Sequence, residues 1–79
     1  MSYDHSRHVL EAVAYRRALE LAHVCWDPSL PLEDPRPHIA AREEIRETLL
    51  EEFDCLEGPE LADLMDEALT TLGFPLEQV

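Results

Sequence analysis

Carboxylates are the side chains in this sequence with the clearest capacity for chemistry. Residues 47–79 contain ten Asp and Glu and no Lys, Arg or His, a formal charge of −10. Residues 1–46 contain eight acids and six arginines, a formal charge of −2. Such a charge destabilises a small domain by self-repulsion, and its field repels nucleic acid and anionic membranes. We therefore expect the charge to act on a basic partner.

The acidic residues recur at helical spacing. Within residues 35–56 five of them occupy an arc of about 100° opposite an apolar stripe, namely Glu43, Glu44, Glu47, Glu51 and Asp54. Residues 59–72 carry a second acidic row with no cation. Carboxylates four residues apart on a helix are separated by about 6 Å, an interval similar to that between phosphates along a DNA strand. A solvated face is the alternative, but such faces usually mix charge signs because opposite charges at this spacing stabilise a helix. The predicted partner-binding residues are Glu43, Glu44, Glu47, Glu51, Asp54, Glu60, Asp63, Asp66 and Glu67.

Zinc donors are present, but their spacing does not suit a zinc site. His5 and His8 form a His-x-x-His pair, and His23 precedes Cys25 in a His-x-Cys pair. These spacings match no zinc finger or ribbon, and residues two apart lie about 160° from each other around a helix. Glu20-x-x-His23 matches one element of a di-iron bundle, which needs a second such element and two further glutamates. A metal-binding homodimer is a remote alternative, and we expect no cofactor.

Catalysis has little support in the sequence. Both glycines fall at expected helix ends, which leaves no glycine-rich phosphate loop. Neither Cys25 nor Cys55 has a nearby His in an electropositive setting that would favour the thiolate. The acid pairs face water, whereas a general acid needs a desolvated site. We therefore expect a non-enzymatic protein.

Helical periodicity and proline positions predict three helices. The segment from Ser6 to Trp26 has no Gly or Pro and is apolar on two sides, which is typical of a central helix or of one that also contacts a second subunit. Four prolines in residues 27–37 favour an extended connection. Asp34 before Pro35 is a helix-start signal, and Gly58 is expected to stop the second helix. Helices are predicted over residues 6–26, 35–56 and 59–72.

These elements predict a single domain over residues 1–79, of the all-α class. The expected architecture is a small three-helix bundle with a proline-rich crossover between the first and second helices. Phe74 is expected to fold back onto the core. The predicted centre of the core is Leu21, Leu49, Phe53, Leu64 and Leu69.

Two groups of residues have more than one interpretation. Arg42 and Arg46 lie beside the inward stripe of the second helix. Their stems either cover the core edge while the guanidinium groups reach Glu11, Glu20 or Glu43, or they anchor an interface. Trp26 and its neighbours have two interpretations, an exposed apolar patch at the end of the first helix or burial in the core, and burial is expected more of Tyr15 than of Trp26. The other members of that patch are Tyr15, Leu30 and Leu32.

The expected location is the cytoplasm, or the host cytoplasm if a phage encodes the chain. No apolar run approaches the roughly 20 residues that span a bilayer, the first residues lack a signal-peptide pattern, and two cysteines make no disulfide framework. The expected function is that of a nucleic-acid mimic, which docks on a basic, nucleic-acid-binding protein surface and blocks it. Anti-CRISPR and anti-restriction inhibitors of phages and mobile elements use this strategy. Size, charge and helical character are the basis for the comparison, because no motif identifies such a family. The alternative is a helical adaptor or antitoxin-like protein that uses an apolar patch for homo- or hetero-oligomerisation.

Overall fold

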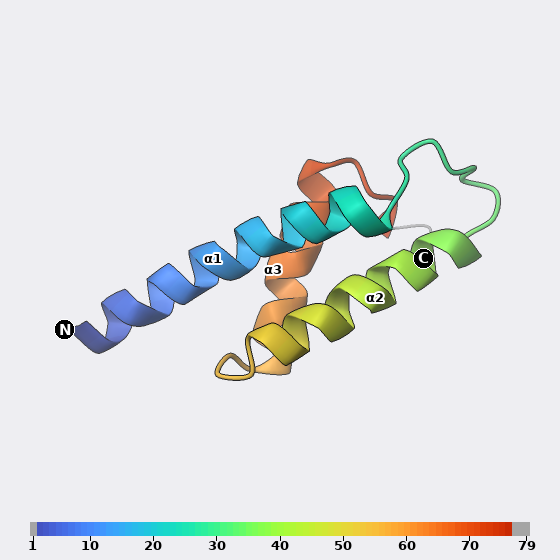
Figure 1. Cartoon of the computed structure of the whole chain (residues 1–79). Helices are drawn as coiled ribbons and strands as arrows, with labels where there is room; N and C mark the ends of the chain where they lie inside the picture. Colours follow the sequence, from blue (N-terminus) through green and yellow to red (C-terminus); the bar gives the residue numbers. More distant parts are fainter. Residues whose placement is uncertain (1, 77–79) are drawn as a thin grey trace.

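Three helices make up the fold of the computed structural model, which describes residues 2–76 and the side chains of residues 7–76. They are α1 (Ser2–Cys25), α2 (Arg36–Glu52) and α3 (Gly58–Thr71), and no strand occurs in this part of the chain. Each helix contacts the other two (Figure 1). The prediction of an all-α three-helix bundle with a long first crossover is confirmed.

Helix α1 is the longest element and contacts both other helices. It begins at Ser2, four residues earlier than predicted, because residues 2–5 contain no Gly or Pro to break it. Ala14, Ala18 and Ala22 are fully buried on its inner side, where small side chains allow close approach of the neighbouring helices. Its N-terminal turns extend past α2 and α3 in Figure 1, consistent with an elongated molecule of 47 × 20 × 20 Å.

The start of α2 differs slightly from the prediction. Pro35, and not Asp34, occupies the N-cap position and has helical backbone angles. The Asp34 carboxylate still accepts a hydrogen bond from the backbone N–H of Arg36 at 3.1 Å. Asp34 therefore satisfies one of the free amides at the start of the helix, as the sequence signal implied.

The turn between α2 and α3 also differs from the prediction. Helix α2 ends at Glu52, four residues early, because Phe53 leaves the helical conformation with φ −122° and ψ 54°. Gly58 was expected to stop α2, but it is the first residue of α3. Pro59 explains this start, because proline lacks an N–H and the first turn of a helix leaves its amides unpaired.

The end of α3 is a Schellman turn built on Gly73. Gly73 has φ 86°, its N–H donates to the Thr70 carbonyl at 3.0 Å, and the N–H of Phe74 donates to the Leu69 carbonyl at 2.9 Å. This reversal returns Phe74 to the core, where it is buried. The expectation for Phe74 is confirmed.

The core lies along the line where the three helices meet. Four of the five predicted central residues are buried: Leu21, Leu49, Phe53 and Leu69. The fifth, Leu64, was predicted wrongly, since it lies on the flank of α3 and is only partly buried. Helix α3 directs four side chains into the core. These are Leu61, Met65, Ala68 and Leu69.

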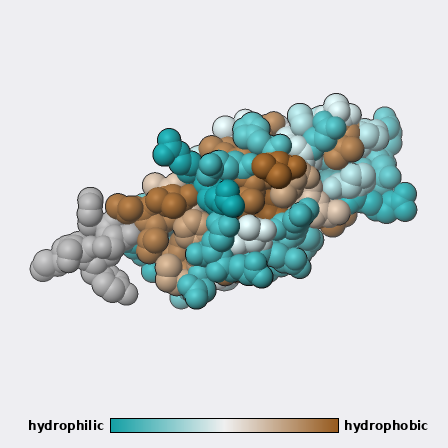
Figure 2. All heavy atoms as spheres, in the orientation of Figure 1, coloured by the Kyte–Doolittle hydropathy of each residue, from teal (hydrophilic) through white to brown (hydrophobic). Residues whose placement is uncertain are grey.

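Trp26 belongs to the core, so of its two interpretations burial holds and an exposed patch centred on Trp26 does not. It is 7% exposed, and its ring packs against Phe74 with 5.0 Å between the ring centroids. Tyr15 is half-buried, which reverses the expected order of burial for the two aromatic residues. Exposed hydrophobic side chains appear beside the N-terminal end of the molecule in Figure 2, and Val9 and Val13 of α1 are among the exposed residues.

Candidate partner-binding surface

Five exposed carboxylates follow the outer side of α2, and we call them the α2 acidic row. The opposite side of the same helix carries Ile45 and Leu49, which are buried, so packing of these residues turns the acids to solvent. The row consists of Glu43, Glu44, Glu47, Glu51 and, just after the helix, Asp54.

One cation approaches the α2 acidic row among the described side chains. Arg46 Nη1 lies 3.9 Å from Glu43 Oε2, and both side chains are about half exposed. A long, exposed pair of this kind contributes at most about 1 kcal/mol. The other four acids of the row have no cation within 4 Å in the part of the chain with described side chains. The row therefore keeps most of its negative charge.

The acids of α3 divide into two kinds. Glu60 is paired with Arg7 of α1, and Arg42 of α2 donates from Nε and Nη2 to Asp66 at 3.0–3.2 Å. Asp63 and Glu67 are exposed and have no ion pair with any described side chain. The expectation that α3 lacks counter-ions was therefore wrong, because α1 and α2 supply them.

The position of Arg42 resolves one of the alternatives for the arginines. Its guanidinium reaches Asp66 across the junction of α2 and α3, and not Glu11, Glu20 or Glu43 as expected. Arg42 and Asp66 are each about one third exposed, so the pair seals the edge of the core. The same pair separates the α2 acidic row from Asp63 and Glu67. Because each set points away from the shared core, the two sets face different directions.

A further ion pair joins α1 to α2. Arg17 donates from Nε and Nη2 to the two carboxylate oxygens of Glu52 at 2.9 and 3.0 Å. This hydrogen bonding, with the charge of Arg17, lowers the pKa of Glu52 despite an opposing effect of desolvation. Glu52 was not a predicted site residue, and its charge is used inside the molecule.

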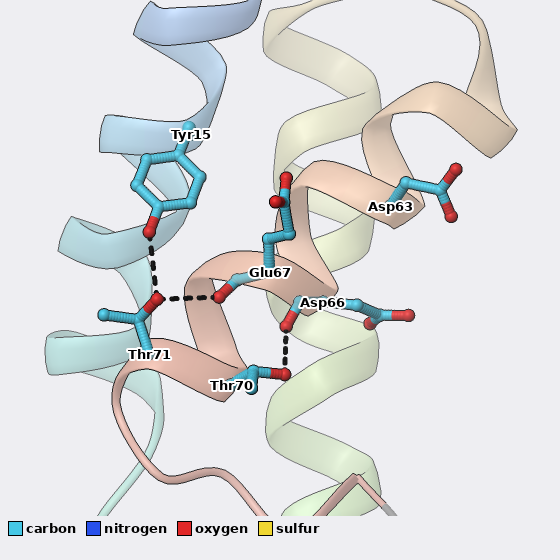
Figure 3. Close-up of a pocket in the computed structure, with 6 residues that line it drawn as sticks. All are labelled: Tyr15, Asp63, Asp66, Glu67, Thr70 and Thr71. Carbon is cyan, nitrogen blue, oxygen red and sulfur yellow. Dashed lines mark hydrogen bonds between the residues drawn. The ribbon is translucent and has the colours of Figure 1, made fainter.

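An open hollow of about 530 Å³ lies between α1 and α3. Figure 3 shows Tyr15 above Thr71, with the carboxylates of Asp63 and Asp66 directed away from the tyrosine. Thr71 Oγ1 donates to the Glu67 carbonyl at 3.0 Å, so the Tyr15 hydroxyl, 3.0 Å away, donates to Thr71. The hydroxyls are thus engaged within the protein. The groups left to meet a ligand are carboxylates, which suit a guanidinium or an ammonium.

Among the described side chains, the residues considered for metal binding and nucleophilic chemistry form no metal-binding cluster. His23 is exposed and Cys25 is half-buried, while His5 lies outside the described side chains. Burial raises the pKa of the Cys25 thiol, Glu44 raises it further, and Arg17 opposes the shift. No group of three or more His, Cys, Asp or Glu is arranged to hold a metal among residues 7–76.

His38 is the polar residue that the sequence analysis missed. It is 1% exposed, it accepts a hydrogen bond from Trp26 Nε1 at 2.9 Å, and its Nε2 lies 3.2 Å from the Pro31 carbonyl oxygen. A signal existed, because His38 shares the inward spacing of Ala41 and Ile45 on α2. Its contacts give it a structural role away from the α2 acidic row.

Comparisons with known proteins give no relative from which site residues could be inferred. A scan against protein-family models and searches of curated proteins and of solved structures each found no match for the chain. No helix in the described part of the chain is long and apolar enough to cross a membrane.

Proposed function

We propose that this chain is a non-enzymatic acidic binding protein that docks on a basic protein surface, one that normally holds nucleic acid, and blocks it. The observation that carries the proposal is the α2 acidic row. Its carboxylates are exposed, and only Glu43 has a cation within 4 Å among the described side chains. Glu52 and Asp66, by contrast, are paired with arginines within the fold. Exposed carboxylates without counter-ions raise the local concentration of a basic partner and speed its association.

The spacing of the row supports mimicry of a nucleic-acid backbone. Glu43, Glu47 and Glu51 follow one another at four-residue intervals, which correspond to steps of about 6 Å on a helix. Backbone hydrogen bonds of α2 hold this spacing, so the charges are presented without ordering a flexible segment. A rigid row of negative charges is what a protein groove lined with Arg and Lys binds on a nucleic acid.

The division of charge on α3 sharpens the proposal. Glu60 and Asp66 were expected to bind the partner, but their oxygens already accept hydrogen bonds from arginines of this chain. We therefore assign the main contact to the α2 acidic row, with Asp63 and Glu67 on a second face. A partner that reaches both faces must be concave, as a nucleic-acid-binding groove is.

Affinity capture with a matched reversal variant tests the proposal. The wild-type chain and the Glu47→Arg/Glu51→Arg variant would be immobilised and exposed to the same host lysate at two salt concentrations, with captured proteins identified by mass spectrometry. We expect at least one nucleic-acid-binding protein that the wild type captures at low salt, the variant does not, and added nucleic acid displaces. Equal capture by both chains, or capture that nucleic acid does not compete away, would contradict the proposal.

A further inference from the structure

The outer side of α1 is uncovered and partly apolar. At 100° per residue, Val9, Val13, Arg16, Glu20 and Val24 fall within an arc of about 80°, opposite the buried alanines. The three valines are 50%, 48% and 83% exposed, respectively. We call these five residues the outer α1 face. Exposed apolar side chains gathered on one helix face are typical of an interaction site.

Charge restricts which partner this face can accept. Helix α1 carries three arginines and three acids, so its formal charge is 0, whereas α2 carries −2 (three arginines, five glutamates) and α3 carries −4. Two copies of a chain with net charge −12 repel each other wherever acidic faces meet. Helix α1 is therefore the element through which a second copy can approach.

Arg16 and Glu20 make the face complementary to itself. The other five arginines each lie within 4 Å of a carboxylate of their own chain, whereas Arg16 and Glu20 have no such partner among the described side chains. The two residues are one helical turn apart, about 6 Å along α1. A two-fold axis midway between them would bring Arg16 of each copy to Glu20 of the other.

From this complementarity we infer that the outer α1 face is the interface of an antiparallel homodimer. Arg16 pairs with Glu20 of the partner subunit twice across the two-fold axis, and Val13 packs near Val24 of the partner subunit. This contact is isologous, so it closes as a dimer and does not propagate. The α2 acidic row lies on another helix and contributes no residue to this contact. The inference stands independently of the proposed function.

Sedimentation equilibrium over a concentration series tests the interface with single and mixed variants. Wild-type protein should shift towards twice the 9.1 kDa chain mass as concentration rises. Arg16→Glu and Glu20→Arg each place like charges across the two-fold axis, and each alone should weaken self-association at least about tenfold. An equimolar mixture of the two variants should form a heterodimer, because every Arg then meets a Glu.

The mixing experiment separates pairing between chains from effects within one chain. Within either variant, residues 16 and 20 carry like charges whether or not the other variant is present, so only contact between chains explains recovery on mixing. Arg36→Glu, at an exposed position outside α1, makes the same change in net charge as Arg16→Glu and should leave self-association unchanged. Circular dichroism checks that helix content is retained. A wild-type chain that stays at 9.1 kDa up to about millimolar concentration, a weakly binding range, or variants that fail to associate on mixing, would overturn the inference.

Discussion

The indole N–H of Trp26 donates a hydrogen bond to His38 Nδ1 at 2.9 Å, and both side chains are buried. Since Nδ1 is the acceptor, the imidazole carries its proton on Nε2, which donates to the Pro31 carbonyl oxygen at 3.2 Å. The two bonds join the end of α1, the crossover and the start of α2. The hydrogen bond to Pro31 thereby attaches the proline-rich segment to the bundle. The prolines alone would favour an extended chain without specifying this contact.

Replacing Trp26 with Phe should destabilise the fold beyond the loss of ring area. The variant removes the donor and leaves Nδ1 of buried His38 unpaired, at a cost of about 1–3 kcal/mol. Urea unfolding followed by far-UV circular dichroism measures the change. Tyr15→Phe is the control, because it removes a hydroxyl from a more exposed hydrogen bond and should cost less. Equal stability of Trp26→Phe and wild type would contradict the structural role of the pair.

Phe53→Ala should remove most of the stability of the domain. Phe53 is 8% exposed at the end of α2, and truncation of a buried Phe costs about 3–5 kcal/mol. Small domains are stable by only about 5–15 kcal/mol, so the variant should melt far below wild type. Leu32→Ala, at a position that is 57% exposed, should melt close to wild type. A cooperative Phe53→Ala transition near the wild-type temperature would show that α2 packs differently.

Added salt should raise the melting temperature. At about 0.5 M salt the Debye length is about 4 Å, which screens repulsion within the α2 acidic row. Salt also weakens the arginine pairs, but each exposed pair contributes only about 0–1 kcal/mol. Calorimetry from low salt to about 0.5 M salt should therefore show a rise for wild type. The rise should be smaller for Glu47→Gln/Glu51→Gln, and a flat or falling wild-type curve would mean that the ion pairs dominate.

The Arg17–Glu52 pair should stabilise the fold only above acidic pH. The pKa of Glu52 in the folded chain is below its ordinary value of 4.5, so the unfolded chain binds the proton more readily. Its contribution is complete above about pH 4.5, where both states are ionised, and is lost as pH falls through the folded-state pKa. Melting temperatures of wild type and Glu52→Gln should differ at pH 7 and converge in acid. Glu51→Gln removes an exposed acid of the α2 acidic row and is the control. At pH 7 its melting temperature should not be lower than that of wild type.

The periodicity of apolar residues was sufficient to predict that three helices form. Local sequence patterns were not sufficient for features that depend on residues distant in the sequence, such as ion pairs between helices and the burial of Trp26. The inward spacing of Leu49 and Phe53 identified a buried face, because a helix fixes which side chains share a side. Gly58 was misassigned because proline at the next position can begin a helix as readily as glycine can end one.

The candidate site shows the same limit. The solvent exposure of the α2 acidic row is local and was predicted, since all of its members lie within one helix and the residues that follow it. The pairing of Asp66 with Arg42, and of Glu60 with Arg7, joins residues 24 and 53 positions apart. Counting charges within one segment cannot detect such pairs. The burial of Trp26 likewise depends on His38 and Phe74, which reach it only through the tertiary fold.

A binding titration of the captured partner at two salt concentrations, with charge-matched variants, tests directly whether the α2 acidic row is the binding surface. Glu47→Arg/Glu51→Arg reverses the centre of the α2 acidic row, and Glu33→Arg/Glu57→Arg makes the same charge change at exposed acids outside it. Val13→Ser is the probe of apolar docking, because Val13 is an exposed hydrophobic residue of α1. If the α2 acidic row is the binding surface, the row reversal should slow association, remove most of the salt dependence and abolish competition with nucleic acid, while the other two variants should bind nearly as wild type does. Unchanged binding by the row reversal together with loss of binding by Val13→Ser would contradict it and favour an apolar adaptor.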